Sequence, residues 1–344
     1  MRRKNHILSG ILISVLTTLL LLAIMEVALR ISGQKAVEQP VLYYYSNIPG
    51  LLYEHRPNTT LIQNGILIST NPYGMRAGNY TLPKPRNVRR IVVLGDSVTS
   101  SLDLDISDTF PRILEQKLNE KQTSNQTEVL NFGVNGYGTR EEAITLKSKA
   151  MAFQPDVIVV AYVLNDPEIS TSFISYFTQR PKEGKRICKI HIIRLPIPCV
   201  ARDLIDSMRL PTFLYGKGVE VWNNLNGDYY TRVSQSEQSW QNVAQGFASI
   251  RETAKGDNIP VVVVIFPLLY GNAEHYKWGW VHEKVREEAE KNGFPVIDLL
   301  DSYSPYNWKD LQIVKSDIVH PNRKGQEIAA QEIYTLLKEK RLAS

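Results

Sequence analysis

From about residue 89 onward, the chain alternates short, continuously apolar segments with longer stretches of helical periodicity. The apolar segments are rich in Val, Ile and Leu, which is typical of strands buried on both faces of a parallel sheet. They lie at residues 91–94, 129–130, 157–163, 261–266 and 296–297. The helical periods lie at about 109–121, 140–152, 234–256, 280–292 and 323–340. This alternation predicts a doubly wound α/β fold, with helices on both faces of a parallel sheet.

The start of the chain has a different pattern. Residues 7–25 form a run of 19 residues without a charge, long enough as a helix to cross the hydrocarbon of a bilayer. Residues 2–4 (Arg-Arg-Lys) precede it, and by the positive-inside rule they hold the N-terminus in the cytoplasm. A cleaved signal peptide is the alternative, but residues 26–30 offer no small-residue cleavage site. We therefore expect a single-pass anchor at 7–25, a cytoplasmic N-terminus at 1–6, and an extracytoplasmic remainder.

Two further segments complete the expected organisation. Residues 26–88 form a juxtamembrane segment rich in Tyr and Pro, and Asn64-Gly65 between the apolar residues 61–62 and 66–68 predicts a hairpin there. The catalytic domain is expected at 89–344. Within it, residues 168–232 interrupt the alternation with several prolines. We interpret this stretch as an insertion that forms a cap or substrate lip; a surface excursion without function is the alternative.

Composition and charge narrow the class of protein. Apolar residues make up 43% of the chain and charged residues 22%, which is typical of a globular protein. The net charge of +5 is modest, and no basic stripe interleaved with aromatic residues suggests a nucleic-acid partner. In an oxidising compartment Cys188 and Cys199 can form a disulfide, although two unrelated thiols fit the sequence as well. None of these features bears on the oligomeric state.

Ser97 directly follows the first apolar segment, in the sequence Gly95-Asp96-Ser97-Val98. At a strand-to-helix turn, unpaired N–H groups and the positive end of the helix dipole favour developing negative charge. Ser97 is therefore a candidate nucleophile whose own N–H can bind an oxyanion. The triplet alone is weak evidence, because chance produces it in about one chain in ten of this length.

His320 stands out among the six histidines because Asp317 precedes it by three residues. Pro321 biases His320 away from helical geometry, and a predicted helix begins shortly afterwards. An aspartate that accepts the Nδ1–H of an imidazole leaves Nε2 to take a proton from a hydroxyl. Accidental spacing in a surface loop explains one such pair equally well.

Two further polar blocks lie at the ends of the second and third apolar segments. Residues 131–136 read Asn-Phe-Gly-Val-Asn-Gly, and Asn165-Asp166 follows residues 157–163. A glycine lets a backbone N–H approach a substrate oxygen closely, and the Asn165 amide can donate to the same oxygen. Because reactive residues of such sheets belong at the carboxyl ends of the strands, the four blocks are expected at one edge.

Together the four blocks resemble those of the SGNH hydrolases, the superfamily of GDSL-like esterases and lipases. They appear in the family's order over about residues 70–340: Gly-Asp-Ser, Asn-x-Gly-x-x-Gly, Asn-Asp and Asp-x-x-His-Pro-Asn. The resemblance implies a three-layer α/β/α, flavodoxin-like sheet of strand order 2-1-3-4-5. It also implies Ser97 as nucleophile, His320 as base and Asp317 as its partner. The implied oxyanion hole consists of the Ser97 N–H, the Gly136 N–H and the Asn165 side chain.

The chain departs from the family pattern at two places. Val163 stands where the third block usually has Gly, and residues 98–101 (Val-Thr-Ser-Ser) replace the Phe-Thr-x-Gly of many anchored members. Neither change involves a reacting atom. Residues 71–76, Asn-Pro-Tyr-Gly-Met-Arg, are similar to an Asn-x-x-Gly-x-Arg element that anchored members carry ahead of the catalytic block.

The resemblance implies a serine esterase that works through an acyl-enzyme, with no cofactor and no metal. With the anchor, it predicts an extracytoplasmic enzyme for an acylated small molecule or glycan, with O-acetyl groups of envelope polysaccharide as the leading candidate. A group of C-terminal aromatic residues is able to form either a surface on which a sugar stacks or part of the core: Tyr270, Tyr276, Trp278, Trp280, Tyr303, Tyr306 and Trp308. An O-acetyltransferase and a catalytically silent glycan-binding protein of the same fold are the alternative functions.

Overall fold

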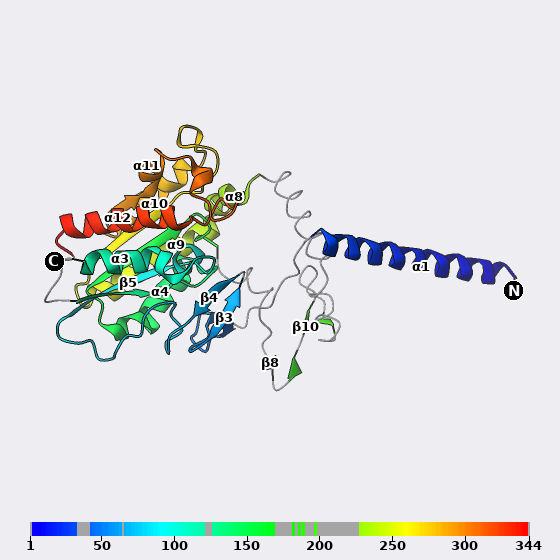
Figure 1. Ribbon diagram of the computed structural model, residues 1–344, viewed down its shortest axis with the longest axis horizontal. Helices are drawn as coiled ribbons and strands as arrows, with labels where there is room; N and C mark the ends of the chain where they lie inside the picture. Colours follow the sequence, from blue (N-terminus) through cyan, green and yellow to red (C-terminus); the bar gives the residue numbers. More distant parts are fainter. Residues whose placement is uncertain are drawn as a thin grey trace. The chain divides into compact units, whose positions relative to one another are not determined.

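The computed structural model describes residues 2–32, 42–63, 65–120, 126–168 and 227–342, and four two-residue strands between residues 181 and 197. Contacts within the chain divide it into two compact units. The first unit comprises Met1–Pro40 and Ser175–Asp228, and the second comprises Val41–Ile174 and Tyr229–Ser344. Figure 1 labels some of the elements of each unit, among them α1 and β8 in the first and β5 and α12 in the second.

The first unit contains the N-terminal helix α1 (Arg2–Ile31). Its segment Ile13–Ile31 has a mean hydropathy of 2.0 and is not buried, so by length and composition it is able to cross a membrane. A helix of this kind serves as a membrane anchor or as a signal sequence.

The unit also contains two antiparallel strand pairs, β8 (Pro181–Lys182) with β9 (Lys185–Arg186) and β10 (Cys188–Lys189) with β11 (Pro196–Ile197). The rest of residues 169–226, which make up most of the expected insertion, lies outside the described residues. The side chains of Cys188 and Cys199 lie there too, so the disulfide stays a prediction.

The second unit is built on a five-stranded sheet in which every strand pair is parallel. Its strands are β5 (Val88–Gly95), β6 (Gln126–Asn131), β7 (Val157–Val163), β12 (Val261–Phe266) and β13 (Val296–Asp298). They are arranged in the order β13-β12-β7-β5-β6. Counted along the chain, this is the 2-1-3-4-5 order, which confirms the expected flavodoxin-like fold.

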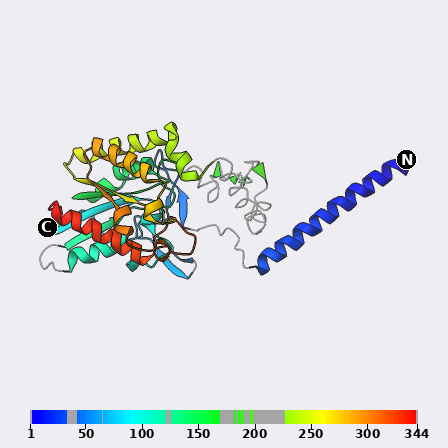
Figure 2. The same cartoon turned by 90° about the horizontal axis from the view of Figure 1, so that it is seen from above.

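Helices cover both faces of this sheet (Figure 2). On one face the core includes α4 (Thr139–Ser148), α9 (Glu237–Lys255) and α10 (Gly279–Lys291). On the other face it includes α3 (Phe110–Asn119), α11 (Leu299–Tyr303) and α12 (Arg323–Glu339). The two layers explain the uninterrupted apolar segments, because side chains on both faces of each strand are buried.

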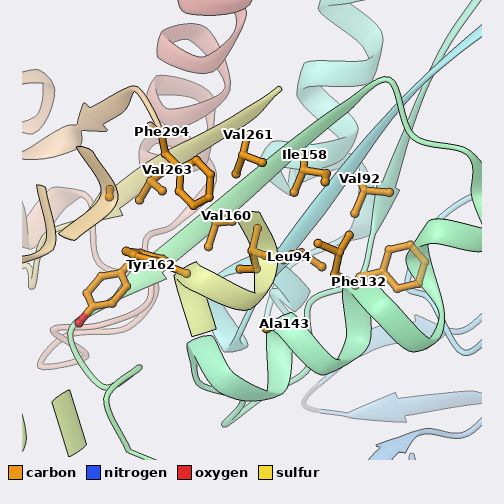
Figure 3. Packing of buried hydrophobic residues seen from close by; sticks show 14 of the residues in the cluster. Val92, Leu94, Phe132, Ala143, Ile158, Val160, Tyr162, Val261, Val263 and Phe294 are labelled. Atoms are coloured by element: carbon orange, nitrogen blue, oxygen red, sulfur yellow. The ribbon is translucent and has the colours of Figure 1, made fainter. Parts of the chain in front are cut away.

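Strand β7 illustrates this arrangement, since all seven of its residues are buried. Ile158, Val160 and Tyr162 join the core on the α4 side, which Figure 3 shows together with Ala143 of α4. Val157 and the alternate residues that follow it join the opposite core. Each fully buried Val or Ile side chain stabilises the fold by about 1.5–3 kcal/mol.

In the described residues, short helices lie between these elements: α2 (Ser97–Ser100) after β5, α8 (Tyr229–Gln235) before α9, and four 3₁₀ turns. The 3₁₀ turns are η1 (Ile106–Asp108), η2 (Ala150–Phe153), η3 (Ala273–His275) and η4 (Trp308–Asp310).

The chain ahead of β5 also folds within the second unit. Strand β1 (Tyr43–Tyr45) pairs with β2 (Tyr53–His55), and β3 (Thr60–Gln63) pairs with β4 (Ile66–Ser69) in the expected hairpin. These strands share a small core with Leu102 and Tyr137. Strands β1–β4, which lie within the segment 26–88 expected next to the membrane, therefore pack against the loops that follow β5 and β6 at the carboxyl edge of the sheet.

Candidate active site

Ser97 is the first residue of helix α2, two residues after Gly95, where β5 ends. Asp96 is the N-cap of this helix, and its Oδ1 accepts a hydrogen bond from the Val98 N–H at 2.8 Å. Gly95 is required because an added Cβ would lie 2.1 Å from Oγ1 of Thr99. The Gly-Asp-Ser triplet thus forms a sharp strand-to-helix turn that presents the Ser97 hydroxyl at the edge of the sheet.

His320 and Asp317 lie beside Ser97, although more than 200 residues separate them in the chain. Nε2 of His320 is 2.8 Å from Oγ of Ser97, and Nδ1 of His320 is 2.8 Å from Oδ2 of Asp317. A carboxylate only accepts, so the proton of the neutral imidazole resides on Nδ1. Nε2 then carries the lone pair and accepts the hydrogen of the Ser97 hydroxyl.

The loop that carries the two residues is fixed by hydrogen bonds on both sides. Oδ1 of Asp317 accepts from the backbone N–H groups of Val319 and His320 at 2.9 and 3.0 Å. The carbonyl of Ile318 accepts from the N–H of Leu269, just beyond β12, at 2.6 Å. Because both flanks are held, the imidazole keeps its orientation when no substrate is present.

The Asn322 side chain then ends this loop by capping α12. Its Oδ1 accepts from the N–H groups of Lys324 and Gly325 at 3.0 and 3.3 Å. Such an N-cap satisfies two of the unpaired donors at the start of a helix. The Asp-x-x-His-Pro-Asn sequence is therefore a loop followed directly by a capped helix.

Electrostatics favours an ionised aspartate and a more basic histidine. Burial raises the pKa of Asp317, but hydrogen bonds and charge from His320 outweigh it and hold this pKa below its ordinary value. Burial lowers the pKa of His320, yet the bond to Asp317 and the charges of Asp317, Asp96 and Asp103 raise it above the ordinary value overall. An imidazole in this setting is a good acceptor for a hydroxyl proton.

Gly136 lies in the turn after β6, where its φ of +76° is a conformation that favours glycine. The turn is closed by the Tyr137 N–H, which donates to the Val134 carbonyl at 3.0 Å. Val134 in turn donates its N–H to the Gly95 carbonyl at 3.1 Å, which attaches the turn to the end of β5. Within the part of the chain that the structure describes, the Gly136 N–H has no acceptor.

Asn165 follows β7, and its Nδ2 donates to Oδ2 of Asp96 at 3.2 Å. The amide orientation is fixed, because the opposite one would direct the carbonyl oxygen at a carboxylate. One hydrogen of the Asn165 NH₂ group is engaged by Asp96, and the other is left for a further acceptor. Asp96 thus links the side chain of Asn165 to the N-terminus of the helix that carries Ser97.

Sequence reasoning assigned no role to Asp96 itself, although its position before a predicted helix was a signal for an N-cap. Oδ2 of Asp96 also lies 3.2 Å from Oγ of Ser97. Burial raises the pKa of Asp96, while bonds from Val98 and Asn165 and the charge of His320 act in the opposite direction. The five expected site positions (Ser97, His320, Asp317, Gly136 and Asn165) all follow sheet strands or precede α12.

The seven candidate stacking residues differ in burial, and Tyr276 is partly buried and packs against both core clusters. Trp278, Tyr303 and Trp308 are almost fully buried and belong to the core. Tyr270, Trp280 and Tyr306 are 57%, 40% and 38% exposed. Among the described residues, no cluster of three or more His, Cys, Asp or Glu side chains is arranged to hold a metal ion.

Comparison with known proteins identifies the family. The sequence model of the GDSL-like Lipase/Acylhydrolase family matches residues 93–328. The chain belongs to this family, and it is a carboxylic ester hydrolase of the SGNH type. No curated protein matches the chain.

Several solved structures are similar to the chain. An acetyl xylan esterase has 15% identity, a TM-score of 0.45, and coverage of 72% of this chain and 99% of its own. A lipase/acylhydrolase from Enterococcus faecalis has 17% identity, a TM-score of 0.43, and coverage of 73% and 96%. TesA has 14% identity, a TM-score of 0.43, and coverage of 73% and 99%.

Proposed function

We propose that this protein is a membrane-anchored, extracytoplasmic serine esterase that removes acyl groups, O-acetyl groups in particular, from envelope polysaccharide. The observation that carries the proposal is the continuous hydrogen-bonded chain Asp317–His320–Ser97, with both imidazole contacts at 2.8 Å. It joins three residue types in the order that nucleophilic catalysis requires.

In the proposed first half-reaction, Oγ of Ser97 attacks the ester carbonyl while Nε2 of His320 takes the hydroxyl proton. Asp317 stabilises the imidazolium that forms. The tetrahedral oxyanion receives hydrogen bonds from the N–H groups of Ser97 and Gly136 and from the NH₂ group of Asn165. Collapse breaks the bond to the leaving alkoxide, which takes the proton from His320, and an acyl-Ser97 ester remains.

In the second half-reaction, water attacks the acyl-enzyme while His320 again accepts a proton. The same three donors bind the second oxyanion, and collapse returns the proton to Oγ of Ser97 and releases the acid. The Gly136 N–H, which has no acceptor among the described residues, and the second hydrogen of the Asn165 amide support this assignment of the hole. Donors that are already in place cost no reorganisation during the reaction.

The proposed location rests on the first helix. In our proposal residues 7–25 cross the membrane, 1–6 remain in the cytoplasm, and the second unit lies outside. Three basic residues before the span, and an apolar segment longer than that of most signal peptides, support a retained anchor. Full-length protein should therefore stay in the membrane fraction after alkaline carbonate extraction, and release of a shorter chain would contradict the anchor.

The proposed glycan substrate is supported by Tyr270. This residue is 57% exposed, and it follows Leu269, whose N–H donates to the Ile318 carbonyl in the loop of Asp317. The ammonium group of Lys277 lies 5.6 Å from the centre of this ring. An exposed aromatic ring in the segment that contacts the Asp317 loop offers an apolar face on which a sugar ring can stack.

The test compares p-nitrophenyl acetate with an acetylated polysaccharide, using full-length protein in detergent. We expect acetate release from both substrates, and no release by Ser97→Ala. Tyr270→Ala should raise KM for the polysaccharide and leave p-nitrophenyl acetate unaffected, whereas the exposed aromatic control Trp280→Ala should change neither. Acetyl transfer to an added glycan that exceeds acetate release would favour the acetyltransferase, and activity retained in Ser97→Ala would refute the proposed mechanism.

A further inference from the structure

Arg76 is a buried cation next to the nucleophile helix, and the proposed mechanism does not use it. Its side chain is only 2% exposed. Nη1 donates to the backbone carbonyl of Ser100 at 3.0 Å and also to that of Ser101, while Nη2 donates to the carbonyl of Leu104. The guanidinium group therefore binds the C-terminal end of α2, whose first residue is Ser97.

The turn that carries Arg76 is itself rigidly built around Asn71. Oδ1 of Asn71 accepts from the N–H groups of Tyr73 and Met75 at 2.9 and 3.0 Å, and its Nδ2 donates to the Gly78 carbonyl at 2.8 Å. Three hydrogen bonds to one side chain fix the backbone immediately before and after the arginine.

Gly74 allows this turn to lie against β2. Its φ is +80°, and an added Cβ would be 2.6 Å from the backbone oxygen of His55. The Asn-x-x-Gly-x-Arg sequence is thus a unit whose first two defined residues shape the turn and whose last residue reaches the catalytic helix.

The chemical setting of Arg76 differs from that of an ordinary ion pair. Among the described residues no carboxylate contacts it, and its hydrogen bonds go to carbonyl oxygens. Burial lowers its pKa to about 10, although the charges of Asp105 and Asp103 act in the opposite direction, so it stays protonated at neutral pH. A buried charge without a contacting counter-ion is costly for stability, and positioning of the site is a reason to retain it.

We propose that Arg76 is a positioning residue that holds the one-turn helix α2 so that the Ser97 hydroxyl meets His320. A helix of four residues has too few internal hydrogen bonds to fix its own orientation. Three bonds to carbonyls at and beyond its C-terminal end prevent rotation or fraying, and the cation complements the negative end of the helix dipole. The inference rests on the proposed function, since it assumes that Ser97 is the nucleophile.

The test separates positioning from folding by counting reactive serines. Full-length wild type, Arg76→Met and Arg76→Lys are titrated with a p-nitrophenyl phosphonate, which labels the nucleophile, and p-nitrophenyl acetate turnover is expressed per labelled site. We expect Arg76→Met to lose about 10–100-fold in kcat per labelled site, because a displacement of about 1 Å can cost 10²-fold. KM should stay within about twofold, because Arg76 binds backbone carbonyls and is not expected to contact the substrate. Arg76→Lys keeps the charge without the fork and should fall between the two.

Arg90 provides a matched control. It is also fully buried, and it donates to the carbonyls of Phe153 and Thr81 at 3.1 and 2.7 Å and to Glu128 at 2.7 Å. These partners lie away from α2. Arg90→Met should reduce the fraction of chains that can be labelled while kcat per labelled site stays that of wild type.

Chemical rescue measures an effect on kcat per labelled site that we do not expect if Arg76 only stabilises the fold. Guanidinium ion at a non-denaturing concentration should raise kcat per labelled site of Arg76→Ala, and leave wild type and Arg90→Met unchanged. Wild-type kcat per labelled site in Arg76→Met, without rescue of Arg76→Ala, would overturn the inference alone. A wild type that the phosphonate does not label at Ser97 would overturn the proposed function and this inference together.

Discussion

Replacement of Asp317 by Asn tests the electrostatic reasoning about the site. Oδ1 of an asparagine can still accept from the Val319 and His320 N–H groups, so the loop should be retained. The NH₂ group would take the place of Oδ2 and would face Nδ1 of His320, now 2.8 Å from Oδ2. Two donors cannot face each other, so the imidazole proton should move to Nε2, which then cannot accept the Ser97 hydrogen.

The magnitude follows from the loss of the base. With the imidazole in the wrong tautomer and no anion to stabilise the imidazolium, kcat should fall on the order of 10⁴-fold. Binding contacts remain, so KM for p-nitrophenyl acetate should change little. Steady-state kinetics of purified Asp317→Asn measures both quantities, and Asp310→Asn, an exposed acid in the chain just before this loop, is the control.

The same variant makes a prediction about pH. His320 acts as a base only when it is neutral, so kcat/KM of wild type should rise with pH. Its midpoint should lie above the ordinary histidine value of about 6.5, because Asp317 raises the pKa of His320. Without that carboxylate the midpoint should move to lower pH. A variant with kcat within tenfold of wild type, or with an unchanged midpoint, would refute the reasoning.

Three further variants test other parts of the account. Asn165→Ala removes one proposed oxyanion donor and should reduce kcat about 10²–10³-fold with a small change in KM, whereas wild-type turnover would exclude Asn165 from the hole. Gly136→Ala places a side chain at a φ of +76° and should lower kcat by shifting the N–H, with unchanged kcat arguing against a role for this N–H. Glu142 of α4 is fully buried, and burial and the charges of Asp96 and Glu141 raise its pKa. Its protonated form therefore stabilises the fold fully below about pH 4.3, the ordinary value for Glu, and this contribution is lost as the pH rises through the raised pKa. Glu142→Gln should therefore melt at a higher temperature than wild type at pH 8 and approach it at pH 4, and parallel melting curves at both pH values would contradict this.

Much of the fold was predictable because its signals are local in the sequence. The buried strands appear as uninterrupted apolar runs, and the helix at Arg323–Glu339 begins within a residue of its predicted start because Asn322 caps it. Two helical boundaries differ from the prediction. The period at 140–152 ends as α4 at Ser148 and is followed by the 3₁₀ turn η2. The period at 234–256 begins in the last residues of α8, and α9 starts only at Glu237. Ser236 caps α9, with its side chain accepting from the Ser239 N–H at 3.3 Å, and so interrupts the helix.

The pairwise chemistry of the site was less accessible. Reactive residues of an open parallel sheet lie at the carboxyl ends of its strands, and this rule predicted that Ser97 and His320 would lie at the same edge. The contacts of Arg76 with the carbonyls beyond Ser97 could not be predicted, because backbone acceptors carry no sequence signal. The role of Asp96 was hidden for a related reason: its contact with Asn165 depends on the relative position of the ends of β5 and β7.

The most direct test of the central claim is a rapid-mixing experiment with p-nitrophenyl acetate under conditions in which deacylation limits turnover. We predict a burst of p-nitrophenol equal to one molecule per active chain, and an acid-quenched sample in which peptide mass spectrometry locates one acetyl group on Ser97. Ser97→Ala should give neither the burst nor the adduct. Turnover without an acetyl adduct on Ser97, or an adduct on another residue, would contradict the assignment of Ser97 as the nucleophile.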